Sequence, residues 1–113
     1  MSGVLAPEPL KEAANPARGE AELRIAGEIL VLRPSFAALV AAEGELGPLF
    51  ALVERAAEGR LGLSEMVGLF WHCLRARPER LTRDGFAEAV TARGLAANTP
   101  VLKTLLGQIL AGR

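Results

Sequence analysis

A chain of 113 residues is expected to form one domain, and its net charge of zero lacks the basic excess typical of nucleic-acid-binding proteins. Half of its residues are hydrophobic and 23% are charged, which excludes a largely disordered chain. The single cysteine, Cys73, excludes an internal disulfide and is typical of a reducing compartment, so we expect a cytoplasmic protein.

The first residues are expected to lie outside the folded core. Residues 1–17 contain three prolines and no sustained periodicity, which predicts a flexible tail ahead of a single domain over residues 18–113. The tail has neither a basic start nor an apolar core segment, so no signal peptide is expected. The longest apolar run, Met66 to Leu74, is far shorter than the ~20 residues of a membrane span. We therefore expect no membrane partner.

A β-hairpin over about residues 20–33 is predicted next. Residues 21–25 alternate between apolar and polar side chains, which is the pattern of a half-buried strand. Gly27 can adopt the positive φ of a tight turn, although the pattern leaves open whether the turn has two or three residues. The apolar run Ile29–Leu32 then predicts a buried second strand.

Helices are predicted from Ser35 onward. Ser35 can cap a first helix that ends at Glu43, and Pro48 suits the first position of a second helix. Gly59 is placed to end that second helix in a left-handed cap. Further caps are predicted at Ser64, Thr82 and Thr99-Pro100.

The predicted fold is therefore α+β, with an N-terminal β-hairpin packed on a bundle of four to five short α-helices. Apolar residues recur at the spacing of one helical face in each predicted helix, and the central residue of each stripe is expected to be buried. These central residues are Leu39, Leu52, Phe70 and Leu105.

The second strand is unusual because it is apolar on both faces, and one helical layer covers only one of them. A two-stranded ribbon also leaves backbone groups unpaired along both outer edges. We therefore expect this strand and exposed apolar positions of the last helix to contact another chain. The alternative is that helices sandwich the hairpin and leave no free surface. The expected contact residues are Ile29, Leu30, Val31, Leu32, Leu102 and Leu106.

No side chains are grouped in a pattern that indicates catalysis. Trp71-His72-Cys73 is the most versatile cluster, but adjacent side chains of a helix point about 100° apart, so we interpret it as helix surface plus core. With one His and one Cys, a zinc site would require carboxylates or a second subunit. Carboxylate pairs such as Glu43/Glu45 and Glu54/Glu58 fall in helix-surface or loop positions. No cofactor or metal site and no enzymatic activity are expected.

Four arginines follow this cluster within a short segment. They are Arg75, Arg77, Arg80 and Arg83. Acidic residues lie among them, so a solvated loop is the default interpretation, and binding of phosphate or an acidic partner is the alternative.

Several segments occur in a characteristic order. Residues 14–20 (Ala-Asn-Pro-Ala-Arg-Gly-Glu) precede the hairpin, and residues 32–39 (Leu-Arg-Pro-Ser-Phe-Ala-Ala-Leu) follow it. Residues 59–64 (Gly-Arg-Leu-Gly-Leu-Ser) lead into an apolar helix, and an amphipathic helix ends the chain. Over Asn15 to Arg113, the chain resembles the tail assembly chaperone family of gene transfer agents and related siphophages, also described as tail tube-like.

This resemblance implies a non-enzymatic protein of tail morphogenesis. It implies that the chain binds the tape measure protein, keeps its long apolar helices soluble and helps tail tube components to assemble around it. Self-association is a further expectation. The alternative function is a small helix-turn-helix module, in which the predicted helices Ser64–Ala76 and Thr82–Arg93 would bring the arginines to nucleic-acid phosphates. The neutral charge argues against nucleic acid as a partner.

Overall fold

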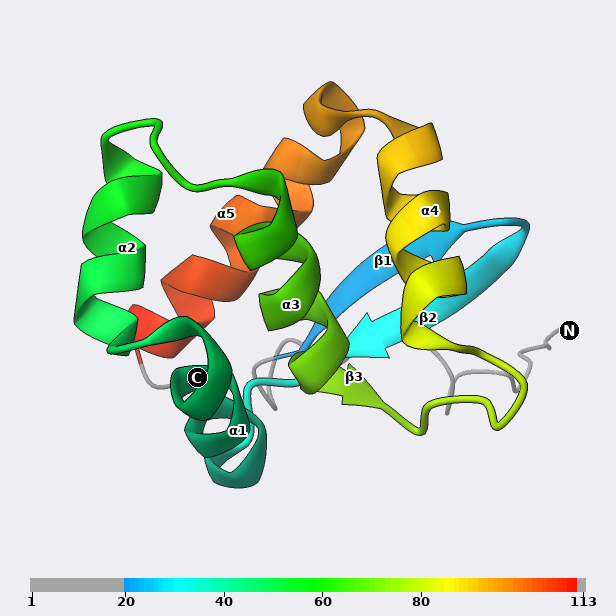
Figure 1. The fold of residues 1–113 in the computed structure, drawn as a ribbon, viewed down its shortest axis with the longest axis horizontal. Helices are drawn as coiled ribbons and strands as arrows, with labels where there is room; N and C mark the ends of the chain where they lie inside the picture. The colour runs from blue at the N-terminus through cyan, green and yellow to red at the C-terminus, as the bar shows by residue number, and fades with distance from the viewer. Residues whose placement is uncertain (1–19, 112–113) are drawn as a thin grey trace, which may run out of the picture.

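The computed structural model describes residues 20–111, and the predicted tail over residues 1–17 lies outside them. Figure 1 shows the predicted α+β architecture, an N-terminal hairpin followed by helices. The elements are β1 (Ala21–Ile25), β2 (Glu28–Leu32), α1 (Phe36–Leu46), α2 (Leu49–Ala57), α3 (Leu63–Cys73), β3 (Leu74–Arg75), α4 (Arg83–Arg93) and α5 (Leu95–Ala111).

The hairpin has a two-residue turn, which resolves the turn length that the sequence left open. Ile25 lies opposite Glu28, so only Ala26 and Gly27 form the loop, with φ values of 50° and 77°. Positive φ at both positions is the geometry of the tight turns that match the twist of the flanking strands. This register turns Leu23, Ile25, Leu30 and Leu32 toward the hydrophobic core.

The expectation that both outer edges of the hairpin are free is wrong. β3 pairs with β2 in antiparallel register, with Val31 opposite Arg75 and Leu32 opposite Leu74, which gives the sheet order β1-β2-β3. The predicted third helix therefore ends at Cys73 and not at Ala76. A two-residue strand carries no periodicity of its own, so only the proximity of β2 in the folded chain defines it.

α1 begins where the sequence predicted and ends later. The hydroxyl oxygen of Ser35 accepts a hydrogen bond of 3.2 Å from the backbone N–H of Ala38, as expected of an N-cap. The helix then continues beyond the predicted end at Glu43 to Leu46, and Gly47 closes it with a φ of 92°. The Glu43 carboxylate instead accepts the backbone N–H of Leu49 at 3.0 Å, so it satisfies the first turn of α2.

α3 begins one residue before the predicted cap at Ser64. Gly62 is the N-cap, and the Glu65 carboxylate accepts the backbone N–H of Gly62 at 2.9 Å. Glu65 thus satisfies a backbone N–H at the start of the helix, and Ser64 lies inside the first turn. The predicted N-cap of α4 is confirmed, because the Thr82 hydroxyl accepts from the backbone N–H of Gly85, and Gly94 ends the helix.

The start of the last helix is the largest error in the predicted boundaries. α5 begins at Leu95, and Pro100 lies inside it and not at its first turn. The backbone N–H of Asn98 donates to the carbonyl of Gly94, and the Thr99 hydroxyl donates to the carbonyl of Leu95. The helix therefore starts directly after Gly94 has closed α4, and Pro100 only removes one donor from its interior.

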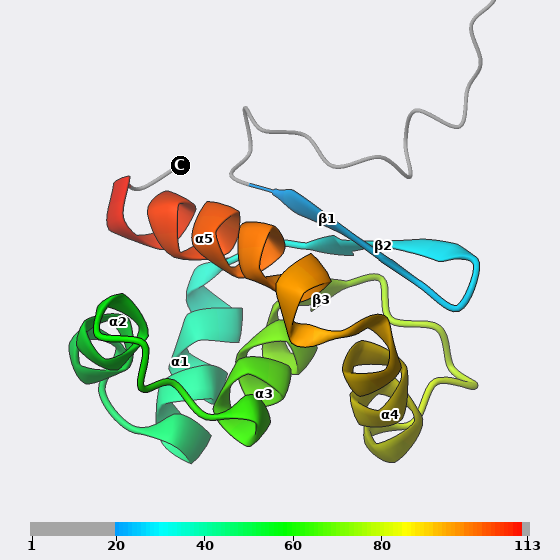
Figure 2. The same cartoon turned by 90° about the horizontal axis from the view of Figure 1, so that it is seen from above.

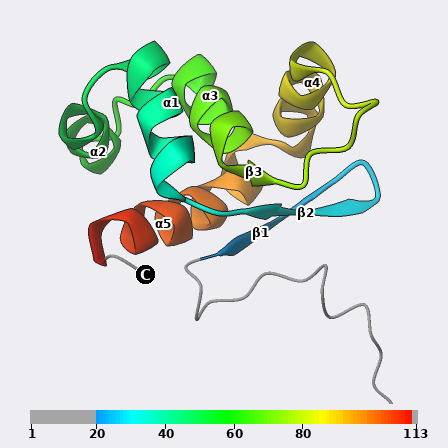
Figure 3. The ribbon, with the colours of Figure 1, turned by 90° about the horizontal axis from the view of Figure 1, so that it is seen from below.

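The described helices lie on one side of the sheet, and α5 runs alongside β1 (Figures 2 and 3). The hydrophobic core lies between the layer of helices and the sheet. Of the four residues expected at its centre, Leu52, Phe70 and Leu105 are at most 1% exposed, which confirms them. Leu39 packs against the core but is only half-buried, so its predicted central position is wrong.

Candidate interaction surfaces

The outward side of α1 is an apolar surface. Phe36 and Val40 lie one turn apart and are 84% and 50% exposed. Ala37, Ala41 and Gly44 are also exposed and complete the same side of the helix, whereas Ala42 on the opposite side is fully buried. We call Phe36, Ala37, Val40, Ala41 and Gly44 the α1 face. The exposed Glu43 lies at the C-terminal end of the same side, three residues after Val40, where its carboxylate accepts the backbone N–H of Leu49.

A second aromatic side chain is exposed close by in the chain. Phe50 lies in the first turn of α2 and is 81% exposed. α1 and α2 are bent by 76° relative to each other. Within the described residues no single helix has the length and apolarity of a membrane span, although α1 and α2 taken together pass that test.

The six residues expected to form the partner contact do not lie on one surface. Leu30–Leu32 are at most 9% exposed, and Leu102 and Leu106 are half-buried against the core. Ile29 is the exception at 45% exposure. Three of the four expected residues of β2 are therefore buried within this chain, although the described helices lie on one side of the sheet and do not sandwich the hairpin.

The exposed residues Phe36, Val40 and Phe50 were missed by the sequence analysis. One signal was present: α1 is apolar on nearly all sides, and a short helix at the edge of a small domain cannot bury all of them. Periodicity identifies a buried side by contrast with a polar side, and α1 offers little such contrast.

A charged cluster joins three helices on another part of the chain. The Arg83 guanidinium donates to both carboxylate oxygens of Glu45, at 2.8 and 2.5 Å, and His72 Nε2 lies 2.8 Å from Glu45 Oε1. Hydrogen bonds from Arg83, and secondarily from His72, lower the pKa of Glu45 from 4.5 to about 2. The same contact raises the pKa of Arg83. Glu45 thus links the end of α1 to α3 and α4.

We expect Glu45→Gln to lower the midpoint of thermal unfolding at pH 7. The pKa of Glu45 is lower in the folded chain, so its contribution to stability is complete above about pH 4.5 and is lost as the pH falls toward about 2. The variant should therefore show a flatter decline of the melting temperature over this interval. Glu88→Gln is the control, because Glu88 is exposed and forms no ion pair with a described residue. If the melting temperatures of Glu45→Gln and the parent chain declined equally steeply toward low pH, this prediction would be contradicted.

The arginine-rich segment does not form a phosphate site within the described residues. Arg75 pairs with the buried Glu20 just before β1, Arg80 with Glu28 of β2 and Arg83 with Glu45 of α1. The Arg77 guanidinium lies 4.1 Å from the centre of the Trp71 ring. The arginines are therefore distributed over intramolecular contacts.

The connection between α3 and α4 does not match a helix-turn-helix. Residues 74–82 separate the two helices and include strand β3, whereas that motif joins its helices by a turn of about 3–4 residues. The predicted helix pair Ser64–Ala76 and Thr82–Arg93 is thus not a helix-turn-helix.

The structure confirms that Trp71-His72-Cys73 is helix surface plus core. Cys73 is 1% exposed, and burial raises the pKa of its thiol to about 12, which leaves little reactive thiolate. Trp71 packs against Phe86, with 5.6 Å between the centroids of the two rings, and His72 contacts Glu45. Among residues 20–111, no group of three or more His, Cys, Asp or Glu side chains could hold a metal ion.

One comparison with known families gives a match. A family model described as "Phage tail tube protein, GTA-gp10" matches residues 18–112, which include all the described helices and strands. No curated protein and no solved structure matches the chain.

Proposed function

The chain belongs to the family described as phage tail tube protein, GTA-gp10, and we propose that it is a non-enzymatic chaperone of tail assembly that binds the tape measure protein. In this proposal the protein acts in the cytoplasm, keeps apolar helices of the tape measure protein soluble and delivers them to tail tube components. The observation that carries the proposal is the exposed α1 face, with Phe36 84% exposed.

The chemistry of the α1 face suits an apolar helix as the partner. Phe36 and Val40 follow the i, i+4 spacing of one helical side, which is the spacing by which helices recognise apolar helices. Ala37, Ala41 and Gly44 are small, so a partner backbone can approach closely beside them. Each large apolar side chain removed from water contributes about 1.5–3 kcal/mol, and the cost of association offsets much of this gain, so the complex is expected to be weak and reversible.

Phe50 extends the proposed contact. Its side chain is as exposed as that of Phe36, and it begins the helix that follows α1 after Gly47 and Pro48. Phe50 thus offers the partner a second exposed aromatic side chain, on a helix bent by 76° relative to α1. Aromatic side chains are typical of the few residues that dominate binding energy in interfaces.

We expect the double variant Phe36→Glu/Val40→Glu to bind the tape measure protein at least about tenfold more weakly, because charge would be buried in an apolar contact. Co-expression of the two proteins followed by pull-down and a titration would measure this loss. Phe36 occupies the first turn of α1, where an acidic residue is favourable for the helix, so the variant should remain folded.

Leu95→Glu is the matched control. Leu95 is 63% exposed and also occupies the first turn of a helix, but it lies on α5. It should leave tape measure binding unchanged. A folded Phe36→Glu/Val40→Glu variant that binds like the parent chain would refute the role of the α1 face, and absence of binding by the parent chain would refute the proposed function.

A further inference from the structure

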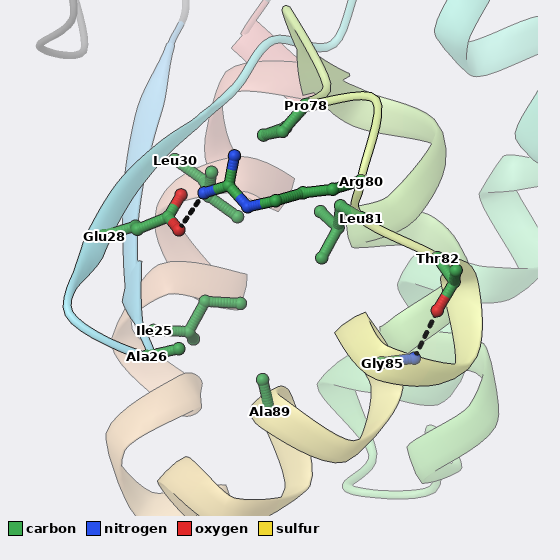
Figure 4. A pocket seen from close by; sticks show the side chains of 10 residues that line it. All are labelled: Ile25, Ala26, Glu28, Leu30, Pro78, Arg80, Leu81, Thr82, Gly85 and Ala89. Carbon is green, nitrogen blue, oxygen red and sulfur yellow. Dashed lines mark hydrogen bonds and ion pairs between the residues drawn. The ribbon is translucent and has the colours of Figure 1, made fainter.

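A hollow of about 240 Å³ lies between the hairpin and α4 (Figure 4). Its walls are mostly apolar, with Ile25 and Leu30 on the hairpin, Leu81 on the loop before α4 and Ala89 on α4 itself. It is smaller than the ~300–1,000 Å³ of small-molecule sites, so its size suits one large apolar side chain.

The strand that lines this hollow has an open edge. In an antiparallel ladder the hydrogen-bonding direction alternates from residue to residue, and the N–H of Arg33 donates to the carbonyl of Cys73 on the β3 side. The backbone groups of Val31 and Ile29 therefore point the same way. β3 pairs with Val31 but ends at Arg75, so no described residue pairs with this side of Ile29.

The cause of the open edge is a turn in the chain after β3. Ala76 has a φ of 53°, a left-handed conformation that is uncommon for a residue with a side chain. It directs the following residues away from β2, and the loop with Pro78 and Arg80 forms the far wall of the hollow. The side of Ile29 that β3 would pair with is thus left without a strand from the described residues.

We propose that this edge and hollow bind an extended segment of a partner chain, which adds to the sheet at Ile29. The N–H and C=O of Ile29 require an extended main chain as their partner. Residues opposite one another on neighbouring strands point to the same face. A partner residue opposite Leu30 therefore enters the apolar hollow, and one opposite Glu28 lies beside a carboxylate.

The chemistry of the walls specifies the segment. If the partner segment runs antiparallel to β2, its sequence is an apolar residue, any residue and then a basic residue. The apolar residue lies opposite Leu30 and the basic residue opposite Glu28, two positions earlier on β2. Arg80 crosses the hollow and pairs with Glu28 at 2.6 Å (Figure 4). Their side chains are 74% and 46% exposed, and such exposed pairs contribute little to stability. A basic side chain of the partner can therefore replace Arg80 on Glu28.

This site is independent of the α1 face, since it recognises an extended segment and not a helix. The test is a titration of the ¹⁵N-labelled full chain with the peptide Ser-Thr-Leu-Thr-Lys-Thr-Ser, followed by NMR. We expect shifts at residues 28–30, 81 and 89, and slower amide hydrogen exchange at Ile29. The same peptide with its central Thr N-methylated should lose binding, because it cannot donate to the strand edge. Replacing its Lys by Glu should weaken binding at least about fivefold through repulsion from Glu28.

Two variants of the chain complete the test. Ala89→Leu fills the hollow and should weaken peptide binding at least about tenfold, whereas Ala92→Leu, at an exposed position of the same helix, should not. Arg80→Ala frees Glu28 and should strengthen binding. Equal binding of the N-methylated peptide, equal binding by Ala89→Leu, or no shift at millimolar peptide would each overturn the proposal. Melting curves of the variants establish that they are folded.

Discussion

Phe70→Ala is expected to lower the free energy of unfolding by about 3–5 kcal/mol. Phe70 lies in the middle of α3 and is completely buried, in a cluster that includes residues of the sheet, α1, α4 and α5. Its removal would leave a cavity inside this cluster, on the helix that packs against both α1 and α4. Urea denaturation followed by circular dichroism would measure the change.

Phe36→Ala provides the matched control, because the same side chain is removed from a position that is 84% exposed. Its free energy of unfolding should remain within about 0.5 kcal/mol of the parent chain. The two variants thus separate the role of Phe in the core from its proposed role in binding. If Phe70→Ala cost no more than Phe36→Ala, α3 would not be the central helix of this fold.

Gly68→Leu is expected to destabilise the fold by up to about 2 kcal/mol. A Cβ atom at Gly68 would lie 3.1 Å from Arg83 Nη2 and 3.2 Å from Leu46 Cδ2, so the larger Leu side chain must displace both residues. Overpacking of this kind costs about 1–3 kcal/mol, and the better helix propensity of Leu offsets up to ~1 kcal/mol of it. Displacement of Arg83 would also disturb its contact with Glu45.

Gly44→Ala is the comparison for this prediction. Gly44 also lies inside a helix, but nothing is within 4 Å of the Cβ that Ala would add. The substitution should therefore stabilise the chain by about 0.5–1 kcal/mol through helix propensity alone. Thermal melts of both variants, recorded side by side, test whether α3 needs its glycine for close packing. A Gly68→Leu variant as stable as Gly44→Ala would contradict that packing.

The hairpin and the order of the helices could be predicted from the sequence because their signals are local. Alternation over residues 21–25, Gly27 in the turn and the caps at Ser35 and Thr82 each depend on a few neighbouring residues. The buried positions Leu52, Phe70 and Leu105 followed from helical spacing in the same way. The family resemblance, which rests on the same segments, was likewise confirmed.

The candidate surfaces could not be predicted because they depend on what the folded chain covers. Leu30–Leu32 are buried in the folded chain, which their apolar sequence did not reveal, and the apolar character of α1 did not identify Phe36 as the residue that stays exposed. The predicted start of the last helix at Thr99-Pro100 was wrong for a related reason. Proline is typical of the first turn of a helix, but α5 begins directly after Gly94, which lies five residues before Thr99 and ends α4. The contact of Glu45 with His72 and Arg83 joins residues far apart in the chain.

The amino-acid sequence by itself determined the α+β class, the hairpin, the succession of capped helices and membership of a tail protein family. These features depend on backbone preferences and apolar spacing within about one or two helical turns. Only the tertiary structure decided that β3 closes half of one sheet edge, that Ile29 stays open beside a hollow and that the α1 face is exposed. Each of these depends on which distant segment occupies the space beside a residue, and local preferences do not encode that proximity.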